Sequence, residues 1–262
     1  MTLKKFLTII IVLFAMASNK AWSFTMNNSS KLTFAQDEVK VNVASGFCSR
    51  LGLTDEELLS LVGIGLDQFW NQSPTSRLKL VKGSLVSVAL DYKTASICQA
   101  STNCVPNSTL AVSNDILISC NTNSTNFSSS AILAVTIPNN ISGTTIVGSL
   151  ILINDQASNQ FVNKSNAEKA SIIAHEIGHA VGLGHSPVTD SLMYYATMDK
   201  RVSLGRDDID GLSYLYPKQQ PISGCGTTEE NKNPTDWWGG FFIGMILFGM
   251  MKYWQKLKVK TS

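Results

Sequence analysis

The sequence predicts an α+β domain, and the order of its segments is the main reason. A capped helix comes early, a series of short apolar strands follows, and two further helices come last. Strands and helices that are grouped in this way, rather than strictly alternating, are typical of the α+β class. The sequence contains no internal repeat and no glycine-rich phosphate loop.

The first half of the chain is expected to form one helix among several strands. Residues 38–43 alternate polar and apolar, which predicts a strand. Thr54 is an N-cap followed by acidic residues, and apolar side chains at helical spacing continue from Leu58 to Trp70 until Pro74 ends the helix. Residues 121–130, rich in Asn, Ser and Thr, are expected to form a solvated loop. Further strands are predicted at residues 78–81, 85–90, 115–119, 131–137 and 148–154.

Two helices are predicted in the second half. Residues 165–168 (Ser-Asn-Ala-Glu) form a capping box, and the helix that they open should end at Gly182, since glycine readily adopts the left-handed conformation of a helix stop. The final helix begins near Asp207 and Asp208. Its apolar residues, at helical spacing, are Ile209, Leu212 and Leu215.

The N-terminus is typical of an exported protein. Lys4 and Lys5 precede an apolar run, and small residues follow, which predicts a signal peptide over residues 1–23 cleaved after Ser23. A cleavage site at residues 15–17 and an uncleaved membrane anchor are the alternatives. We expect residues 24–217 to form the exported domain and residues 218–236 a polar stalk.

A second apolar segment, residues 237–254, predicts a C-terminal transmembrane anchor. Aromatic residues lie at both of its ends, and the tail of residues 255–262 is basic without an acidic residue, so the tail should stay cytoplasmic. One alternative is a core or amphipathic helix that ends the soluble domain. Another is a sorting segment that is cleaved after export, which would leave a secreted protein.

The charge of the exported domain argues against nucleic-acid binding, and its cysteines indicate an oxidising compartment. Seven of the 21 Lys and Arg lie in the terminal segments, which leaves 14 basic against 19 acidic residues and gives no electrostatic footprint for nucleic acid. All five cysteines lie in the exported part, which suits an oxidising compartment. Cys98 with Cys104 is the expected short-loop disulfide and Cys48 with Cys120 the second. The sequence does not fix this connectivity, and Cys225, which is left over, is either free, bridges two molecules or disturbs the expected pairing. The oligomeric state is not predicted.

All three histidines of the chain fall within eleven residues: His175, His179 and His185. Positions i and i+4 share one helix face, so His175 and His179 can bind one metal ion. Gly182 lets the backbone turn sharply, which brings His185 within reach as a third ligand. Three protein ligands leave one position of a zinc ion open, as catalysis requires, and Glu176 is placed to act as general base toward a zinc-activated water.

The complete string H-E-x-x-H-x-x-G-x-x-H resembles that of the metzincin metalloproteases, and Met193 within residues 191–195 resembles their methionine-containing turn. Ser186 after the third histidine, residues 204–212 and residues 132–134 are similar to the matrixins, the family of the matrix metalloproteinases. The resemblance covers roughly residues 32–217 and is strongest over residues 171–216.

This resemblance implies a twisted, mostly parallel sheet with an antiparallel edge strand, an active-site helix and a C-terminal helix. It implies an endopeptidase with one catalytic zinc, acting on extracellular or envelope proteins. Met193 would form the floor of the site, and Leu133 and Ala134 of the edge strand would bind the peptide substrate. Tyr195 resembles a tyrosine of the astacin and serralysin branches that contacts the metal; it would contact the metal or the oxyanion, or simply pack within the turn.

The chain also departs from animal matrixins. Leu152 stands where a histidine of their structural zinc is expected, so we expect no second zinc. The absence of a P-R-C-G latency motif and of a hemopexin-like domain favours a bacterial source without that form of activation. Asn154 and Asp155 lie where a calcium ligand would be expected.

Two other functions compete with the endopeptidase: a surface binding or adhesion module that keeps zinc without hydrolysis, and a closed structural zinc site.

Overall fold

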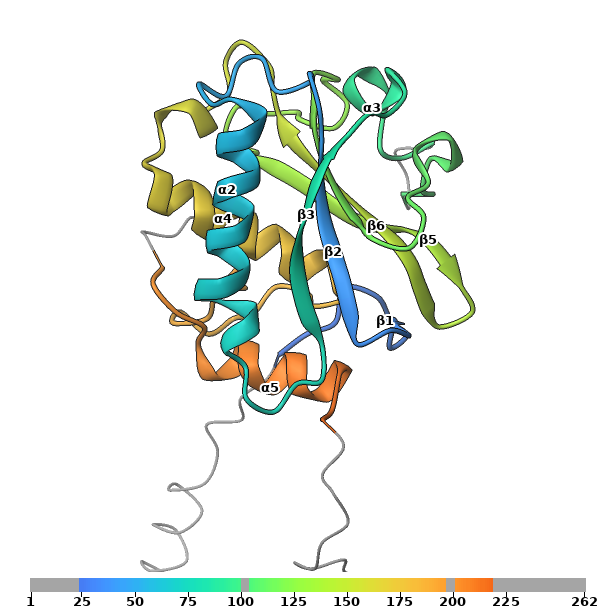
Figure 1. Cartoon of the computed structure of the whole chain (residues 1–262), viewed down its shortest axis with the longest axis vertical. Helices are drawn as coiled ribbons and strands as arrows, with labels where there is room; N and C mark the ends of the chain where they lie inside the picture. Colours follow the sequence, from blue (N-terminus) through green and yellow to red (C-terminus); the bar gives the residue numbers. More distant parts are fainter. Residues whose placement is uncertain (1–23, 100–103, 197–200, 219–262) are drawn as a thin grey trace, which may run out of the picture. The chain divides into compact units, whose positions relative to one another are not determined.

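One sheet of six strands organises the described part of the chain (Figure 1). The order is β1-β6-β4-β2-β3 with parallel pairing throughout, and β5 pairs antiparallel with β6. The mostly parallel sheet with an antiparallel strand is therefore confirmed. The strands are β1 (Thr33–Phe34), β2 (Glu38–Ala44), β3 (Lys79–Val86), β4 (Ile116–Asn121), β5 (Ala134–Ser142) and β6 (Thr145–Asn154).

This computed structural model describes residues 24–99, 104–196 and 201–218, all within one unit. The predicted signal peptide, almost all of the stalk, the apolar segment 237–254, the basic tail and Cys225 lie outside the described residues. Among the helices that are described, none is long and apolar enough to cross a membrane.

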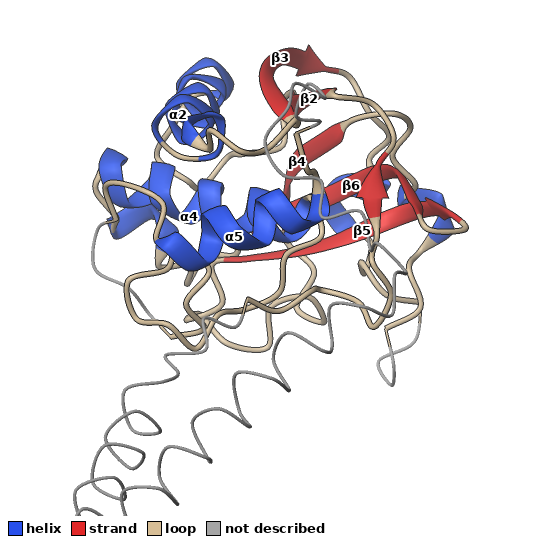
Figure 2. Ribbon diagram, turned by 90° about the horizontal axis from the view of Figure 1, so that it is seen from below, coloured by secondary structure: helices blue, strands red, loops and turns tan. Residues whose placement is uncertain are grey.

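The two longest helices pack on the same face of the sheet, as Figure 2 makes visible. The helices are α2 (Asp55–Gln68), α3 (Asp91–Thr94), α4 (Asn166–Ala180) and α5 (Arg206–Leu215). On that face, Ile116 and Ile151 join the main apolar cluster, whereas Leu117 and Leu150 on the opposite face join a second, smaller one. Because both faces are covered, β4 is buried along its whole length.

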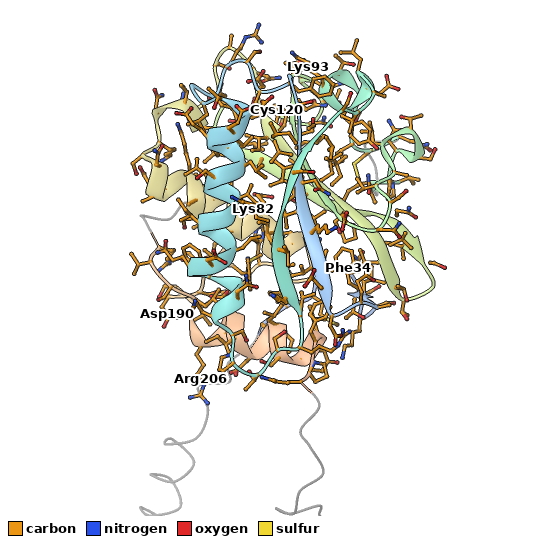
Figure 3. The ribbon with its side chains drawn as sticks, in the orientation of Figure 1. Phe34, Lys82, Lys93, Cys120, Asp190 and Arg206 are labelled. Carbon is orange, nitrogen blue, oxygen red and sulfur yellow. A yellow bond between two sulfur atoms is a disulfide. The ribbon has the colours of Figure 1, made fainter. Side chains whose placement is uncertain are left out.

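The helix ends agree with the sequence in most respects. The predicted N-cap at Thr54 and the predicted capping box at Ser165 are both present, and Thr54 also forms a capping box with Glu57. The first helix ends at Gln68 rather than at Pro74, because the chain tightens into a 3-10 turn over Trp70–Gln72. Lys82 of β3 points toward α2 (Figure 3), where Gly63 leaves room: a Cβ there would lie 3.0 Å from Lys82 Cδ.

The two strands predicted at residues 78–81 and 85–90 are one strand, β3, and residues 87–90 lie outside it. Gly83 interrupts the apolar pattern but not the strand. A Cβ at Gly83 would lie 2.1 Å from Oδ1 of Asn42, and that same oxygen accepts a hydrogen bond from the Ser84 amide at 3.0 Å. The register between β2 and β3 shifts at this point. Glycine thus accommodates an irregularity in the ladder rather than a turn.

Strand β5 is displaced from the prediction of residues 131–137. It begins at Ala134 and continues through Pro138 to Ser142. Proline has no amide hydrogen for the ladder, and the register with β6 shifts between Pro138 and Asn140. The strand therefore continues beyond Pro138, although it was expected to end at residue 137, and this proline lies in an edge strand of the sheet.

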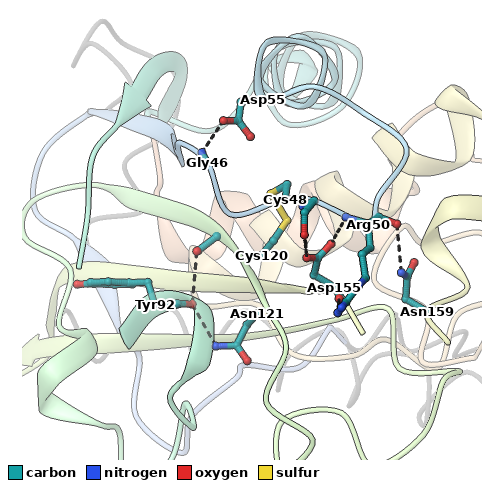
Figure 4. Close-up of a disulfide and its surroundings, with 11 residues drawn as sticks. Gly46, Cys48, Arg50, Asp55, Tyr92, Cys120, Asn121, Asp155 and Asn159 are labelled. Carbon is teal, nitrogen blue, oxygen red and sulfur yellow. Dashed lines mark hydrogen bonds between the residues drawn. A yellow bond between two sulfur atoms is a disulfide. The ribbon is translucent and has the colours of Figure 1, made fainter. Parts of the chain in front are cut away.

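The expectation of a solvated loop over residues 121–130 is wrong for part of it. Asn121, Asn126 and Phe127 are buried. The Asn121 side-chain amide donates to the Tyr92 carbonyl (Figure 4) and to the Ala95 carbonyl. The Asn126 side-chain amide donates to Asn121 Oδ1 at 2.9 Å. Asparagine side chains satisfy buried backbone carbonyls here, so a polar composition coexists with burial.

Both predicted disulfides are confirmed. Cys48, after β2, is bonded to Cys120 at the end of β4, with a Cα–Cα distance of 4.9 Å (Figure 4). Cys98 and Cys104 close the short loop, with a Cα–Cα distance of 5.0 Å.

Candidate metal centre

Helix α4 is fixed at its start and along its length. Ser165 Oγ accepts from the Glu168 amide, and Glu168 Oε2 accepts from the Ser165 amide at 2.8 Å. Ala174 is buried, and its carbonyl accepts the Trp70 indole N–H at 2.7 Å. These contacts set the rotation of the helix, and with it the direction in which His175 and His179 point.

The end of α4 turns the chain back toward those histidines. The Leu183 amide donates to the Gly178 carbonyl at 2.9 Å, and the Gly182 amide to the His179 carbonyl at 3.0 Å. This is a Schellman motif, which requires a left-handed residue. Gly182 has φ of 107°, and a Cβ on it would lie 2.7 Å from the Leu32 carbonyl oxygen. The predicted role of this glycine as helix stop is confirmed.

The structure brings the three histidines together. Their candidate ligand atoms all lie within 4.8 Å of one another. The ring centroids of His175 and His179 are 4.8 Å apart, and those of His179 and His185 are 4.7 Å apart. Among the described residues, this is the one group of His, Cys, Asp or Glu side chains that could hold a metal ion.

Hydrogen bonds fix which nitrogen each helix histidine can offer. His175 Nδ1 lies 2.7 Å from the Leu192 carbonyl, and His179 Nδ1 lies 2.8 Å from the Leu183 carbonyl. A carbonyl only accepts, so both Nδ1 atoms carry the hydrogen and both Nε2 atoms keep a lone pair. Burial lowers the pKa of His179 to about 3. Burial and the nearby His175 also lower the pKa of His185. Neutral imidazoles oriented in this way fit zinc.

Glu176 lies beside the triad. Burial raises the pKa of its carboxyl, and the charge of His175 and a hydrogen bond from Thr136 oppose this. Thr136 Oγ1, from β5, donates to Glu176 Oε2 at 2.5 Å. Sequence reasoning missed Thr136, because its contact with Glu176 depends on how β5 is placed against α4.

A cavity of about 480 Å³ opens next to Glu176. The residues that line it come from three segments that are separate in sequence and include Leu133, Ala134, His175, Glu176 and Tyr195. Leu133 and Ala134 thus lie on the wall of the same cavity as the candidate base. Tyr195 is 63% exposed, and its backbone N–H donates to the Ser186 carbonyl.

Met193 is buried below α4. A Cβ on Gly178 would lie 2.3 Å from Met193 Sδ, so the methionine packs directly against the helix between the two histidines. The Asp208 carboxylate, from the first turn of α5, holds this turn by accepting the amides of Leu192 and Met193 and the hydroxyl of Ser191. From the sequence, Asp208 was expected only to lie near the start of the final helix.

A segment at the start of the described chain holds the loop of the third histidine. Thr25 Oγ1 donates to the His185 carbonyl at 2.6 Å, and the Gly184 amide donates to the Thr25 carbonyl at 2.8 Å. The Asn27 amide donates to the Gly182 carbonyl at 2.9 Å. No sequence signal pointed to Thr25, which follows the predicted cleavage site by two residues.

The residues considered for other metals have other contacts. Leu152, at the position expected for a structural-zinc histidine, is buried opposite Val135 in the second apolar cluster. Asp155 is buried and accepts from Ser49 and from the Arg50 amide with its two carboxylate oxygens, as Figure 4 shows. The side-chain amide of Asn154 donates to the Ile132 carbonyl. The calcium prediction gains no support from these contacts.

Comparison with known proteins identifies the class. The Matrixin family profile matches residues 67–217, more than half of the chain, and the chain belongs to this family. Metalloendoproteinase 5-MMP of Arabidopsis thaliana is 35% identical over 83 residues, covering 29% of this chain and 23% of the relative. Matrix metalloproteinase-19 of Homo sapiens is 41% identical over 66 residues, covering 24% and 13%.

The hatching enzyme of Paracentrotus lividus is 39% identical over 74 residues, covering 28% of this chain and 12% of the relative. The matched segment thus spans less than a quarter of each of these relatives. All three come from plants or animals, so the bacterial source stays a prediction.

Proposed function

We propose that this chain is a zinc-dependent endopeptidase that hydrolyses peptide bonds of extracellular or envelope proteins. One observation carries the proposal, the arrangement of three imidazoles beside a carboxylate. The candidate ligand atoms of the three histidines lie within 4.8 Å of one another, and His175 and His179 keep Nε2 free. Glu176, the residue after His175, lies on the wall of a cavity. Membership of the matrixin family supports the class of reaction.

Each residue has a role in the proposed reaction. His175, His179 and His185 would hold a zinc ion, which would polarise the scissile carbonyl and make a water molecule more acidic at neutral pH. Glu176 accepts the proton of the attacking water and returns it to the leaving amide nitrogen. Met193 supports the helix histidines from below. Tyr195 contributes a hydroxyl near the oxyanion or only shapes the cavity.

The substrate peptide is proposed to add to the sheet edge at Leu133 and Ala134. Strand β5 pairs with β6 alone among the described strands, so its other edge is available for backbone pairing. Both residues line the cavity with Glu176, so a peptide bound along this edge would lie beside the proposed base.

Export to an oxidising compartment is the proposed setting. Two disulfides form within the described residues, and such bonds persist outside the cytoplasm. Residues 237–254 are proposed as a membrane anchor or a cleaved sorting segment.

The test compares the purified chain with its Glu176→Ala variant on a peptide library. We expect loss of a general base to lower kcat by about 100- to 10,000-fold while zinc content stays unchanged. Removal of zinc by a chelator should abolish cleavage, and added zinc should restore it. Glu56→Ala is the matched control, because Glu56 is exposed in the first turn of α2.

Two outcomes would reject this function. Cleavage by Glu176→Ala at the wild-type rate would remove the carboxylate from the mechanism. A zinc-loaded wild-type chain that cleaves nothing in the library would favour the binding or adhesion module instead.

A further inference from the structure

Strand β5 presents two different faces. Val135 and Ile137 pack into the second apolar cluster, whereas Ala134 packs against the main cluster on the side of α4, as does Leu133 just before the strand. Alternation along a strand places Thr136 on the α4 side as well. Its hydroxyl is therefore the polar group that this strand directs at the active-site helix.

The hydroxyl meets the candidate base. Thr136 Oγ1 donates to Glu176 Oε2 at 2.5 Å, across 40 positions of sequence. No other described residue donates a hydrogen bond to this carboxylate. Oε1 keeps no protein donor in the described part of the chain, and Glu176 lines the cavity. One oxygen is thus anchored to the sheet and the other is left for the reaction.

The residue type suits an anchor. A glutamate side chain has three rotatable bonds, so the helix alone does not fix where its carboxylate points. Threonine is branched at Cβ and stiff at χ1, which holds its hydroxyl in one direction relative to the strand. A stiff donor on β5 therefore orients a flexible acceptor on α4.

We propose that Thr136 is a positioning residue, whose hydroxyl fixes the Glu176 carboxylate relative to a peptide bound along β5. This inference rests on the proposed function. Ala134 at the start of this strand and Leu133 directly before it lie on the cavity wall, so the proposed substrate and the base would take their positions from one segment of chain. Small errors in such positioning are costly, since a displacement of about 1 Å can lower a rate about 100-fold.

Thr136→Val, which removes the hydroxyl and keeps the shape, is the test variant in the full chain. We expect kcat to fall about 10- to 100-fold with KM within about twofold, because positioning of the base acts on the chemical step and not on substrate binding. Thr136→Ser keeps the hydroxyl and should restore most of kcat. Thr145→Val is the matched control, a half-buried threonine at the start of β6.

The double variant Thr136→Val with Glu176→Ala separates positioning from a general effect on the fold. If Thr136 acts through Glu176, adding Thr136→Val to Glu176→Ala lowers kcat no further. Wild-type kcat in Thr136→Val, equal loss in Thr136→Val and Thr136→Ser, or full additivity in the double variant would each overturn the inference. An inactive wild-type chain, or an active Glu176→Ala variant, would instead reject the proposed function itself.

Discussion

The two histidines on α4 and the histidine beyond its end are held in different ways. His175 and His179 each have a ring nitrogen bonded to a backbone carbonyl, at 2.7 and 2.8 Å. The His185 ring has no hydrogen bond to another described residue, and its position comes from the backbone contacts of its loop with Thr25. His179 is buried, whereas His185 is exposed.

This difference concerns which contacts orient each histidine ring. The carbonyls that orient the helix rings belong to Leu183 and Leu192, both outside the helix. The helix thus supplies the spacing of two ligands, and the segment after it supplies their ring orientation. His185 lacks the second kind of support. Preorganisation of a metal site depends on such outer contacts as much as on the ligands themselves.

Replacing one ligand from each region gives the largest expected effect. His179→Ala should lower zinc affinity far beyond the roughly 100-fold typical of an outer-contact loss, because no water can easily fill a buried position. His185→Ala should lower it less, since solvent reaches that side and can take the open coordination position. Competition with a chromophoric chelator measures both affinities. Equal losses in the two variants would contradict the proposed difference.

Asp208→Asn tests the support of the helix ligands from below. An asparagine cannot accept from Ser191, Leu192 and Met193 at once, so buried donors lose their partner. We expect a loss of about 3 kcal/mol in the free energy of unfolding, because hydrogen bonds to a charged group are worth about 1.5–3 kcal/mol each. Zinc affinity should fall about 10- to 100-fold, as Leu192 orients His175.

Asp210→Asn is the matched control for this measurement. Asp210 lies on the same helix, and its ion pair with Arg206, at 3.6 Å, is on the surface. Such a pair contributes less than about 1 kcal/mol. Urea unfolding of the two variants compares them directly, and equal destabilisation would show that the buried network around Asp208 has no special weight.

Sequence alone predicted the clustering of the three histidines better than the contacts that support them. The order of the main elements, the N-cap at Thr54, the capping box at Ser165, the glycine stop and the short-loop disulfide follow from local patterns, and the structure contains all of them. The second disulfide, Cys48 with Cys120, was the remaining expected pairing and is also present. The closeness of the three histidines follows from helix periodicity and one glycine. These features depend on residues that are near in sequence or have few alternative partners.

The supports depend on contacts that no local pattern records. Thr136 lies 40 positions from Glu176, and Thr25 lies 160 positions from His185. Their roles require the register of β5 on β6 and the path of the first described residues. The division of β3 into two predicted strands has a related cause, because the close approach of Gly83 to Asn42, which lets the strand continue, is not visible in the local sequence pattern.

Thr25→Val gives the smallest expected effect and tests the loop ligand alone. Removing the 2.6 Å bond to the His185 carbonyl should cost about 1 kcal/mol of stability, since a neutral hydrogen bond contributes about 0.5–1.5 kcal/mol. Zinc should dissociate a few-fold faster, because the loop moves more freely while the rings of the two helix ligands keep their carbonyl partners. Stopped-flow chelation measures this rate, with Thr33→Val in β1 as the control. A dissociation rate unchanged from wild type would mean that the ligand loop needs no support from the first described residues, and that its Schellman turn at Gly182 suffices to place His185.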